Sequence, residues 1–132
     1  MTIRAPLPRP PFGLHTRVKV VRVLDGDTVE CVGELLGKRF RVRILGINAP
    51  ETRTRDQEEK QKGLQAKHFL QNMLLDREGV SLLIPLPEKP EYDLLRSLLT
   101  MDRILGHLYL DDETSVADEM VKEGMARWMD KS

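Results

Sequence analysis

The sequence predicts an α+β domain that is mainly β, and three observations predict it. Apolar and polar residues alternate with period two in several short segments. Gly, Asp and Pro separate those segments, as they do in turns. Two stretches with helical spacing, near 63–75 and 115–123, follow the third and the fifth segment. Five short antiparallel strands with an intervening helix suit a five-stranded Greek-key barrel, the OB-fold, with two or three packed helices.

The first three strands are predicted close together in the chain. From Thr16 onward, Val18, Val20 and Val23 alternate with basic residues, which is typical of a half-buried strand. The turn residues Asp-Gly-Asp at 25–27 then reverse the chain, and 28–32 returns as the second strand of a hairpin. The third strand is 39–45, where three apolar side chains face one side and three arginines face the other.

The remaining elements are predicted from periodicity and capping signals. A helix from about Gly63 to Leu75 places Leu64, Ala66 or His68, Phe69, Met73 and Leu74 near one face. Strands are expected at 80–86 and within 98–110, separated by an irregular segment with a helical turn at 87–97. A last helix begins at a Ser115 cap, runs to Glu123 and ends at Gly124.

The chain of 132 residues is long enough for one domain with a real core. Residues 1–15, rich in proline, are expected to be a flexible lead-in, and 16–132 to form the domain. No apolar run long enough for a signal peptide or a membrane span is visible in the sequence. A complete chain is therefore expected in the cytoplasm, and a chain whose leader was removed is expected to be secreted.

Charge and cysteine content narrow the function classes. The net charge is zero, but residues 1–43 carry nine Lys and Arg against four Asp and Glu. A basic first third is compatible with phosphate contact and also with an ordinary surface of mixed charge. The lone cysteine, Cys31, excludes an internal disulfide framework and a zinc cluster, and we expect it to be buried as a small apolar residue.

Four residues in the right order point to phosphodiester chemistry. Asp25 and Asp27 flank one glycine in a tight turn, where closely spaced carboxylates suit a hard cation such as Ca²⁺. Arg43, near the end of its strand, offers a planar guanidinium for the charge that develops on a phosphate under attack. Glu51 follows the break at Pro50. Each of these features also occurs in ordinary hairpins and on solvated surfaces, so only their combination is informative.

The combination resembles the staphylococcal nuclease (thermonuclease) family. VLDGDTVEC followed by RVRILGINAPE resembles that family's D-G-D-T hairpin and its R-x-x-x-[ILV]-[DN]-x-P-E segment. GLQAKHFLQNML is similar to the first helix of the family, RILGHLY to its strand with a second arginine, and VADEMVKEGMA to the helix that follows. The resemblance covers roughly residues 16–128 and implies an OB-barrel.

The resemblance implies a Ca²⁺ site. Asp27 matches the first carboxylate ligand, Ala49 a ligand through its backbone carbonyl, and Asp25 an acid near the metal. Asn48 departs from the family pattern, since most active members carry Asp there as the second carboxylate ligand. An amide oxygen can coordinate Ca²⁺, but the lost charge predicts weaker binding.

The resemblance also implies the catalytic residues. Glu51 matches the carboxylate that orients and deprotonates the attacking water, and Arg43 and Arg103 match two arginines that hold the phosphate. A glycine usually precedes the second arginine, where this chain has Asp102. The predicted function is a calcium-dependent nuclease that acts on single-stranded DNA or RNA and leaves 3′-phosphate ends. No membrane and no obligate protein partner are expected.

Two alternatives from other classes remain open at this point. One is an OB-fold of nuclease ancestry that binds nucleic acid without cutting it, which Asn48, the zero net charge and the scarcity of aromatic residues favour. The other is a protein-interaction domain that uses its basic strand face or its proline-rich segment. Asp27, Glu51, Arg43 and Arg103 argue against both, because neither role needs all four.

Overall fold

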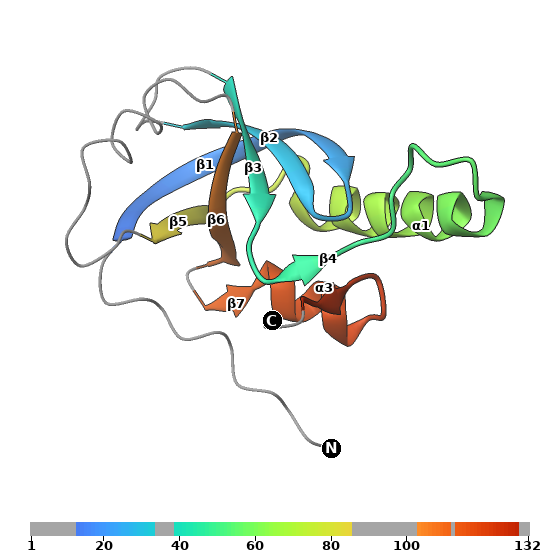
Figure 1. The fold of residues 1–132 in the computed structure, drawn as a ribbon. Coiled ribbons are helices and arrows are strands. Elements are labelled where there is room, and N and C mark those ends of the chain that lie inside the picture. The colour runs from blue at the N-terminus through green and yellow to red at the C-terminus, as the bar shows by residue number, and fades with distance from the viewer. Residues whose placement is uncertain (1–12, 34–38, 86–102, 112, 130–132) are drawn as a thin grey trace, which may run out of the picture.

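A computed structural model describes residues 13–33, 39–85, 103–111 and 113–129 (Figure 1). The elements are β1 (Gly13–Asp25), β2 (Thr28–Gly33), β3 (Arg39–Ile44), β4 (Ile47–Asn48), α1 (Gln57–Leu74), β5 (Val80–Pro85), β6 (Arg103–Leu110), β7 (Thr114–Ser115), α3 (Val116–Lys122) and β8 (Arg127–Trp128). Neither helix in these ranges has the length and apolar character needed to cross a bilayer. The predictions for 87–97, for 98–102 and for 1–12 lie outside the described residues.

Five strands close into a barrel, as the sequence predicts. The main sheet has the order β3-β2-β1-β5-β6-β7, and a parallel pairing between β3 and β6 joins its two sides. The chain forms β1, β2 and β3 as a meander, passes through α1, and returns antiparallel through β5 and β6 (Figure 1). The α+β, OB-type fold predicted from the sequence is therefore confirmed. The barrel interior is filled by branched aliphatic side chains with Phe40, among them Val20, Val42, Leu82 and Leu108.

The first strand begins earlier than predicted, and its predicted valines are buried. β1 begins at Gly13, three residues before the predicted start at Thr16, and residues 13–15 pair with Pro85, Ile84 and Leu83 of β5. The buried valines are 18, 20 and 23, because the register shifts between Val20 and Arg22. Such a bulge moves later side chains to the opposite face, which keeps Val23 inside the barrel.

The long helix begins earlier than predicted and buries a different face. Asp56 caps α1, since its carboxylate accepts hydrogen bonds from the backbone N–H groups of Glu58 and Glu59 at 3.0 and 3.3 Å. The first turns are wholly polar, so an apolar period alone could not locate them. The buried face consists of Gly63, Ala66, Leu70 and Leu74, while Leu64, expected inside, is 43% exposed. Phe69 and Met73 pack at the edge of the core, and His68 is exposed.

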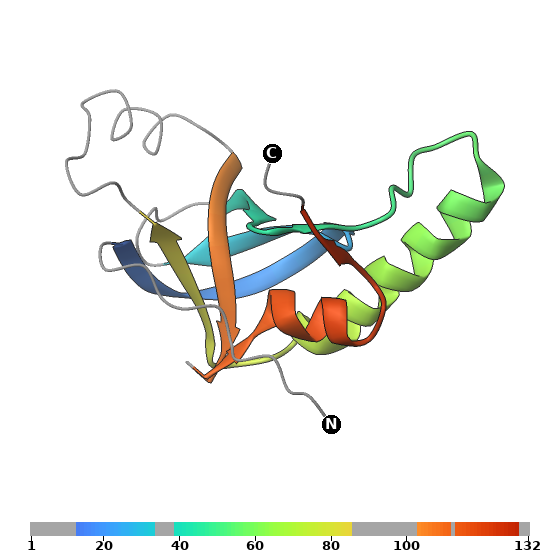
Figure 2. The same ribbon diagram turned by 60° about the horizontal axis from the view of Figure 1, so that its bottom comes forward.

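The C-terminal helix follows its prediction. Ser115 accepts a hydrogen bond from the backbone N–H of Asp118 at 3.3 Å, and Gly124 follows the helix with a positive φ of 74°. α3 packs against β6, and the chain then forms β8, which pairs with β4 (Figure 2). This small second sheet was not predicted from the sequence. It links the C-terminal part of the described chain to the segment that carries Asn48.

The lone cysteine is fully buried on β2, as predicted. Burial raises the pKa of the Cys31 thiol to about 12, with a further contribution from the neighbouring Glu30 carboxylate. Because an unfolded thiol titrates near ~8.5, its contribution to stability is complete below that pH and is lost as the pH rises towards 12. We therefore expect Ellman's reagent at pH 8 to label Cys31 rapidly in urea and very slowly in the native protein. Fast native labelling would contradict this burial.

Candidate functional site

All of the predicted site residues except Arg103 lie on or beside a place where three segments meet. These are the turn between β1 and β2, the end of β3 with the segment through β4 to Glu51, and the first half of α1 (Figure 1). The turn carries Asp25 and Asp27, and β3 ends just after Arg43. A backbone hydrogen bond from Ile44 N–H to the Asp27 carbonyl, 2.8 Å long, fixes the turn against β3. Residues far apart in sequence are thus held together by the barrel.

Arg43 is the best-fixed side chain of the site. Its Nη1 donates to the Ile44 carbonyl at 2.7 Å, and its Nη2 donates to Asn48 Oδ1 at 3.1 Å. The same Nη2 lies 3.4 Å from Asp27 Oδ2 in an ion pair, and only 15% of the Arg43 side chain is exposed. These contacts use at most three of the five guanidinium N–H groups. The guanidinium is held in one orientation and keeps donors for a further anion.

Asp27 joins the turn to the segment after β3. The residue is buried at 8% exposure, and its Oδ1 accepts from the Thr28 hydroxyl at 3.0 Å. Its Oδ2 accepts from the backbone N–H of Ala49 at 3.0 Å and faces Arg43. A buried carboxylate needs such partners, because desolvation without them is costly. Asp27 therefore positions Ala49 as well as Arg43.

Asp25 holds the neighbouring loop. Its Oδ1 accepts from the Thr52 hydroxyl at 2.6 Å and, more weakly, from the Thr52 backbone N–H at 3.4 Å. Thr52 directly follows Glu51, so the bond anchors the backbone beside that carboxylate. Thr52 was not predicted from the sequence as a site residue. A threonine after the Pro-Glu pair was the available signal, but it points to no partner until the fold is known.

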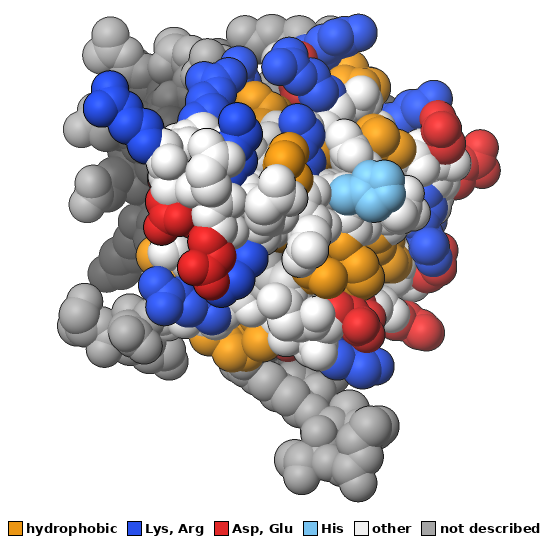
Figure 3. Space-filling model, turned by 90° about the vertical axis from the view of Figure 1, so that its right-hand side faces the viewer, with side chains coloured by type: hydrophobic (Ala, Val, Ile, Leu, Met, Phe, Trp, Pro, Cys, Tyr) orange, Lys and Arg blue, Asp and Glu red, His pale blue; other side chains and the backbone are white. Residues whose placement is uncertain are grey.

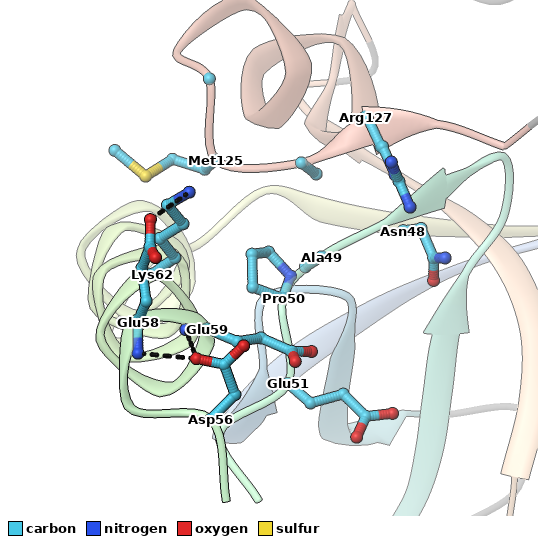
Figure 4. Close-up of a pocket in the computed structure, with 12 residues that line it drawn as sticks. Asn48, Ala49, Pro50, Glu51, Asp56, Glu58, Glu59, Lys62, Met125 and Arg127 are labelled. Carbon is cyan, nitrogen blue, oxygen red and sulfur yellow. Dashed lines mark hydrogen bonds and ion pairs between the residues drawn. The ribbon is translucent and has the colours of Figure 1, made fainter. Parts of the chain in front are cut away.

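Asn48 and Glu51 present their polar groups on the same side of the 48–51 segment. Figure 4 shows both side chains directed away from α1, and both residues are exposed. Arg127 of β8 pairs with Asn48 in register, and its side chain points towards Asn48 (Figure 4). Arg127 was also missed from the sequence, because the β4–β8 pairing that brings it to the site involves only two residues on each strand.

For Arg103, the position of the backbone on β6 is described. Arg103 opens β6 and lies opposite Arg41 in the parallel pairing of β3 with β6, while Arg43 is opposite Leu105. Arg103 therefore starts on the strand next to Arg43, one pleat repeat away along the strand direction. That both arginines serve one site stays a prediction.

Two glycines allow the three segments to pack at backbone distance. A Cβ added at Gly26 would lie 2.7 Å from the Cβ of Ala66 and 2.9 Å from that of Ala49. A Cβ added at Gly63 would lie 2.5 Å from the Glu51 carbonyl oxygen and 3.0 Å from that of Pro50. The G-x-x-A spacing of α1 thus serves close contact, since Gly63 faces the 50–51 backbone and Ala66 faces the turn.

We expect Gly63→Ala to destabilise the protein, although alanine favours helix by about 1 kcal/mol. Overpacking against a carbonyl that has a fixed position costs about 1–3 kcal/mol, and the clash also displaces Glu51. Urea denaturation measures the first effect and cleavage rates the second. Gln65→Ala, at an exposed position on the same helix, is the matched control. A more stable Gly63→Ala protein would show that the 50–51 segment yields without strain.

A cleft of about 690 Å³ lies beside the site. The first turns of α1 form one wall with Asp56, Glu58, Glu59 and Lys62, and the α3–β8 connection forms the other with Met125 and Arg127 (Figure 4). Of the predicted site residues, Asn48, Ala49 and Glu51 border it, whereas Asp27 and Arg43 do not. The cleft is thus adjacent to the Arg43 cluster and separated from it by the 48–51 segment.

The donor atoms of the cluster are of the type that Ca²⁺ prefers. Asp27 Oδ2 and Asn48 Oδ1 both lie within 3.4 Å of Arg43 Nη2, so one cation already interacts with both. Oxygen ligands of this kind suit hard cations. Among the residues that the structure describes, no three His, Cys, Asp or Glu side chains are grouped as a metal site. A Ca²⁺ ion here would depend on one carboxylate, one amide oxygen and a backbone carbonyl, with water.

Comparison with known proteins shows which family this chain resembles. The model of the family described as staphylococcal nuclease homologue matches residues 41–132. A thermonuclease from Staphylococcus hyicus is 30% identical over 109 residues, which is 83% of this chain and 57% of that protein. An uncharacterised endonuclease from Escherichia coli is 29% identical over 108 residues, covering 82% of this chain and 58% of the relative.

A third relative is an uncharacterised protein, MJ1439, of Methanocaldococcus jannaschii. It is 26% identical over 133 residues, which is 86% of this chain and 59% of the relative. The chain thus spans less than two thirds of the length of the curated relatives it matches. The closed barrel, the cluster around Arg43 and the family match over most of the chain agree, and the chain belongs to the staphylococcal nuclease homologue family.

Proposed function

We propose that this chain is a metal-dependent nuclease that hydrolyses phosphodiester bonds of DNA or RNA. The observation that carries the proposal is the fixed guanidinium of Arg43, which keeps free donors at the end of β3 next to Asp27 and Asn48. Support also comes from the two relatives whose names are thermonuclease and endonuclease. Glu51 is exposed and lies three residues after Asn48, the hydrogen-bond partner of Arg43, which supports its proposed role.

In the proposed reaction, water attacks phosphorus in line with the bond to the 5′ oxygen. The Glu51 carboxylate accepts a proton from the water, while Arg43 and Arg103 donate to the non-bridging oxygens, where negative charge grows. The bond from phosphorus to the 5′ oxygen breaks, the oxygen takes up a proton, and a 3′-phosphate remains. Ca²⁺, when bound by Asp27, Asn48 and the Ala49 carbonyl, would supply further positive charge at the phosphate.

The proposal is tested by incubating purified protein with labelled single-stranded DNA and RNA in Ca²⁺, in Mg²⁺ and in EDTA. We expect cleavage with Ca²⁺, none with EDTA, and products whose 3′ ends are removed by a 3′-phosphatase. If no acid-soluble nucleotide is released at millimolar Ca²⁺, the proposal is wrong. Substrate preference follows from the two rates measured side by side.

A second candidate function is a module that binds nucleic acid without cutting it. The contact between Arg43 and Asn48 favours it, because Asn48 contributes no charge and Arg43 already neutralises Asp27. A site with so little negative charge attracts Ca²⁺ weakly. Binding of oligonucleotides that persists in EDTA, together with no cleavage at any Ca²⁺ concentration, would favour this function over the enzyme.

A further inference from the structure

The outer face of β1, β2 and β3 is strongly basic. Cross-strand pairing arranges its side chains in rows: Lys19, Val32 and Arg39 form one row, and Arg22, Glu30 and Arg41 form the next. Arg43 follows at the end of β3, opposite Thr28. The four basic residues of the two rows are exposed, while Val20, Cys31 and Phe40, which lie between the rows, are buried in the barrel. This basic face therefore ends at the guanidinium of the candidate site.

Among the residues that the structure describes, few acidic side chains compensate the positive charge of the basic face. Glu30 is its acidic residue in the two rows, and its side chain is only 16% exposed and lies 3.9 Å from Arg22. None of the ion pairs among the described residues engages Lys19, Arg39 or Arg41. Lys and Arg side chains gather along the upper edge of the view in Figure 3.

The wall that α1 contributes to the cleft beside the candidate site is acidic. Asp56, Glu58 and Glu59 occupy the first turn of α1, which borders the cleft beside Glu51 (Figure 4). Lys62 is the basic residue on this wall, and it already pairs with Glu58 at 3.5 Å. A polyanion is repelled by this wall and attracted by the basic face. A polyanion is therefore expected to reach the site from the basic face.

We propose that the basic face binds the phosphate backbone of single-stranded nucleic acid and leads it to Arg43. Arginines two residues apart on one strand lie roughly 7 Å apart, which is comparable to the spacing of neighbouring phosphates in an extended strand. Three strands span roughly 10 Å, the width of one nucleic-acid strand rather than of a duplex. Val32 is the apolar side chain in these two rows and is only partly exposed, which favours a polyanion over a folded protein partner.

The proposal that this face leads substrate to Arg43 rests on the proposed nuclease function. Binding of nucleic acid to the face is measured separately, under conditions without cleavage. The test uses Arg39→Gln/Arg41→Gln, with Lys60→Gln/Lys67→Gln on α1 as a control of equal charge change outside the face. Fluorescence anisotropy with a labelled oligothymidylate in EDTA gives the affinity at several salt concentrations. Circular dichroism checks that each variant is folded.

We expect the Arg39/Arg41 variant to bind roughly tenfold more weakly, and its plot of log K against log salt to be shallower by about 1.4, which is ~0.7 for each phosphate that is no longer neutralised. The control is expected to bind like the wild type. Equal weakening in both variants, or in neither, overturns the proposal, as does wild-type binding to phosphatidylserine vesicles but not to the oligonucleotide. A protein that binds in this way and cuts nothing contradicts only the nuclease assignment.

Discussion

Replacing Arg43 by alanine is expected to lower the rate of phosphodiester cleavage by about 10³-fold. Removal of one preorganised donor from a transition state costs about 10²–10³-fold, and a phosphate-clamping arginine is worth up to about 10⁵-fold. Arg43 is held by Ile44, Asn48 and Asp27 before any substrate arrives, so its orientation costs little when charge develops. Initial rates on a labelled oligonucleotide at saturating Ca²⁺ measure the loss.

Arg43→Lys is the control for charge without geometry. A lysine keeps the positive charge beside Asp27 but cannot donate the paired N–H bonds of a guanidinium. We expect Arg43→Lys to recover binding of the oligonucleotide more fully than its cleavage. Equal activity of the wild type and Arg43→Ala would indicate a contaminating nuclease and would sink the assignment.

The loss of activity must also be separated from unfolding, because Asp27 is buried and depends on Arg43 as its cation. Leaving a buried charge without its partner destabilises a protein by about 3–5 kcal/mol. Urea denaturation therefore accompanies the rate measurements. Ca²⁺ affinity is expected to stay the same or to rise in Arg43→Ala, since a positive charge 3.4 Å from Asp27 is removed.

The parts of the fold that sequence predicts are those with a uniform local period. β3 is the clearest, because Phe40, Val42 and Ile44 are buried while Arg39 and Arg41 are exposed, as strict alternation requires. The cap at Ser115 was also readable, since its serine and the acidic first turn form a local signal. Where period or capping is confined to a few neighbouring residues, local chemistry is enough.

The parts that sequence could not predict depend on contacts between distant segments. The bulge in β1 appears only in the pairing of β1 with β2. The sheet formed by β4 and β8 contains only two residues on each strand, too few to show a period. The start of α1 was missed because its first turns carry no apolar residue, although Asp56 and Glu59 have the spacing of a capping box. The contact between Asp25 and Thr52 is of the same kind, since the two residues are 27 positions apart and no pattern in the sequence joins them.

Asn48→Asp is expected to raise Ca²⁺ affinity about tenfold or more. In the wild type the formal charges of Arg43 and Asp27 cancel and Asn48 adds none, so the cluster offers a cation no net attraction. An aspartate would bring the cluster to a net charge of −1 with almost the same shape. Two unit charges 4 Å apart interact by ~4 kcal/mol near a protein surface, and pairing of the new carboxylate with Arg43 consumes part of that.

Calorimetric titration measures the affinity for Ca²⁺. Cleavage rates across Ca²⁺ concentrations show whether a change in affinity also changes the maximal rate. Asn48→Ala is the matched control, expected to bind Ca²⁺ more weakly because it loses the amide oxygen that faces Arg43 at 3.1 Å. If Asn48→Asp binds no better than the wild type, position 48 is not a ligand. If it binds tightly and reaches the same maximal rate, Asn48 limits metal affinity alone, and the wild-type protein is an enzyme that works at higher Ca²⁺. If the wild type cleaves nothing and Asn48→Asp cleaves the oligonucleotide, the wild-type protein is the module that binds nucleic acid without cutting it.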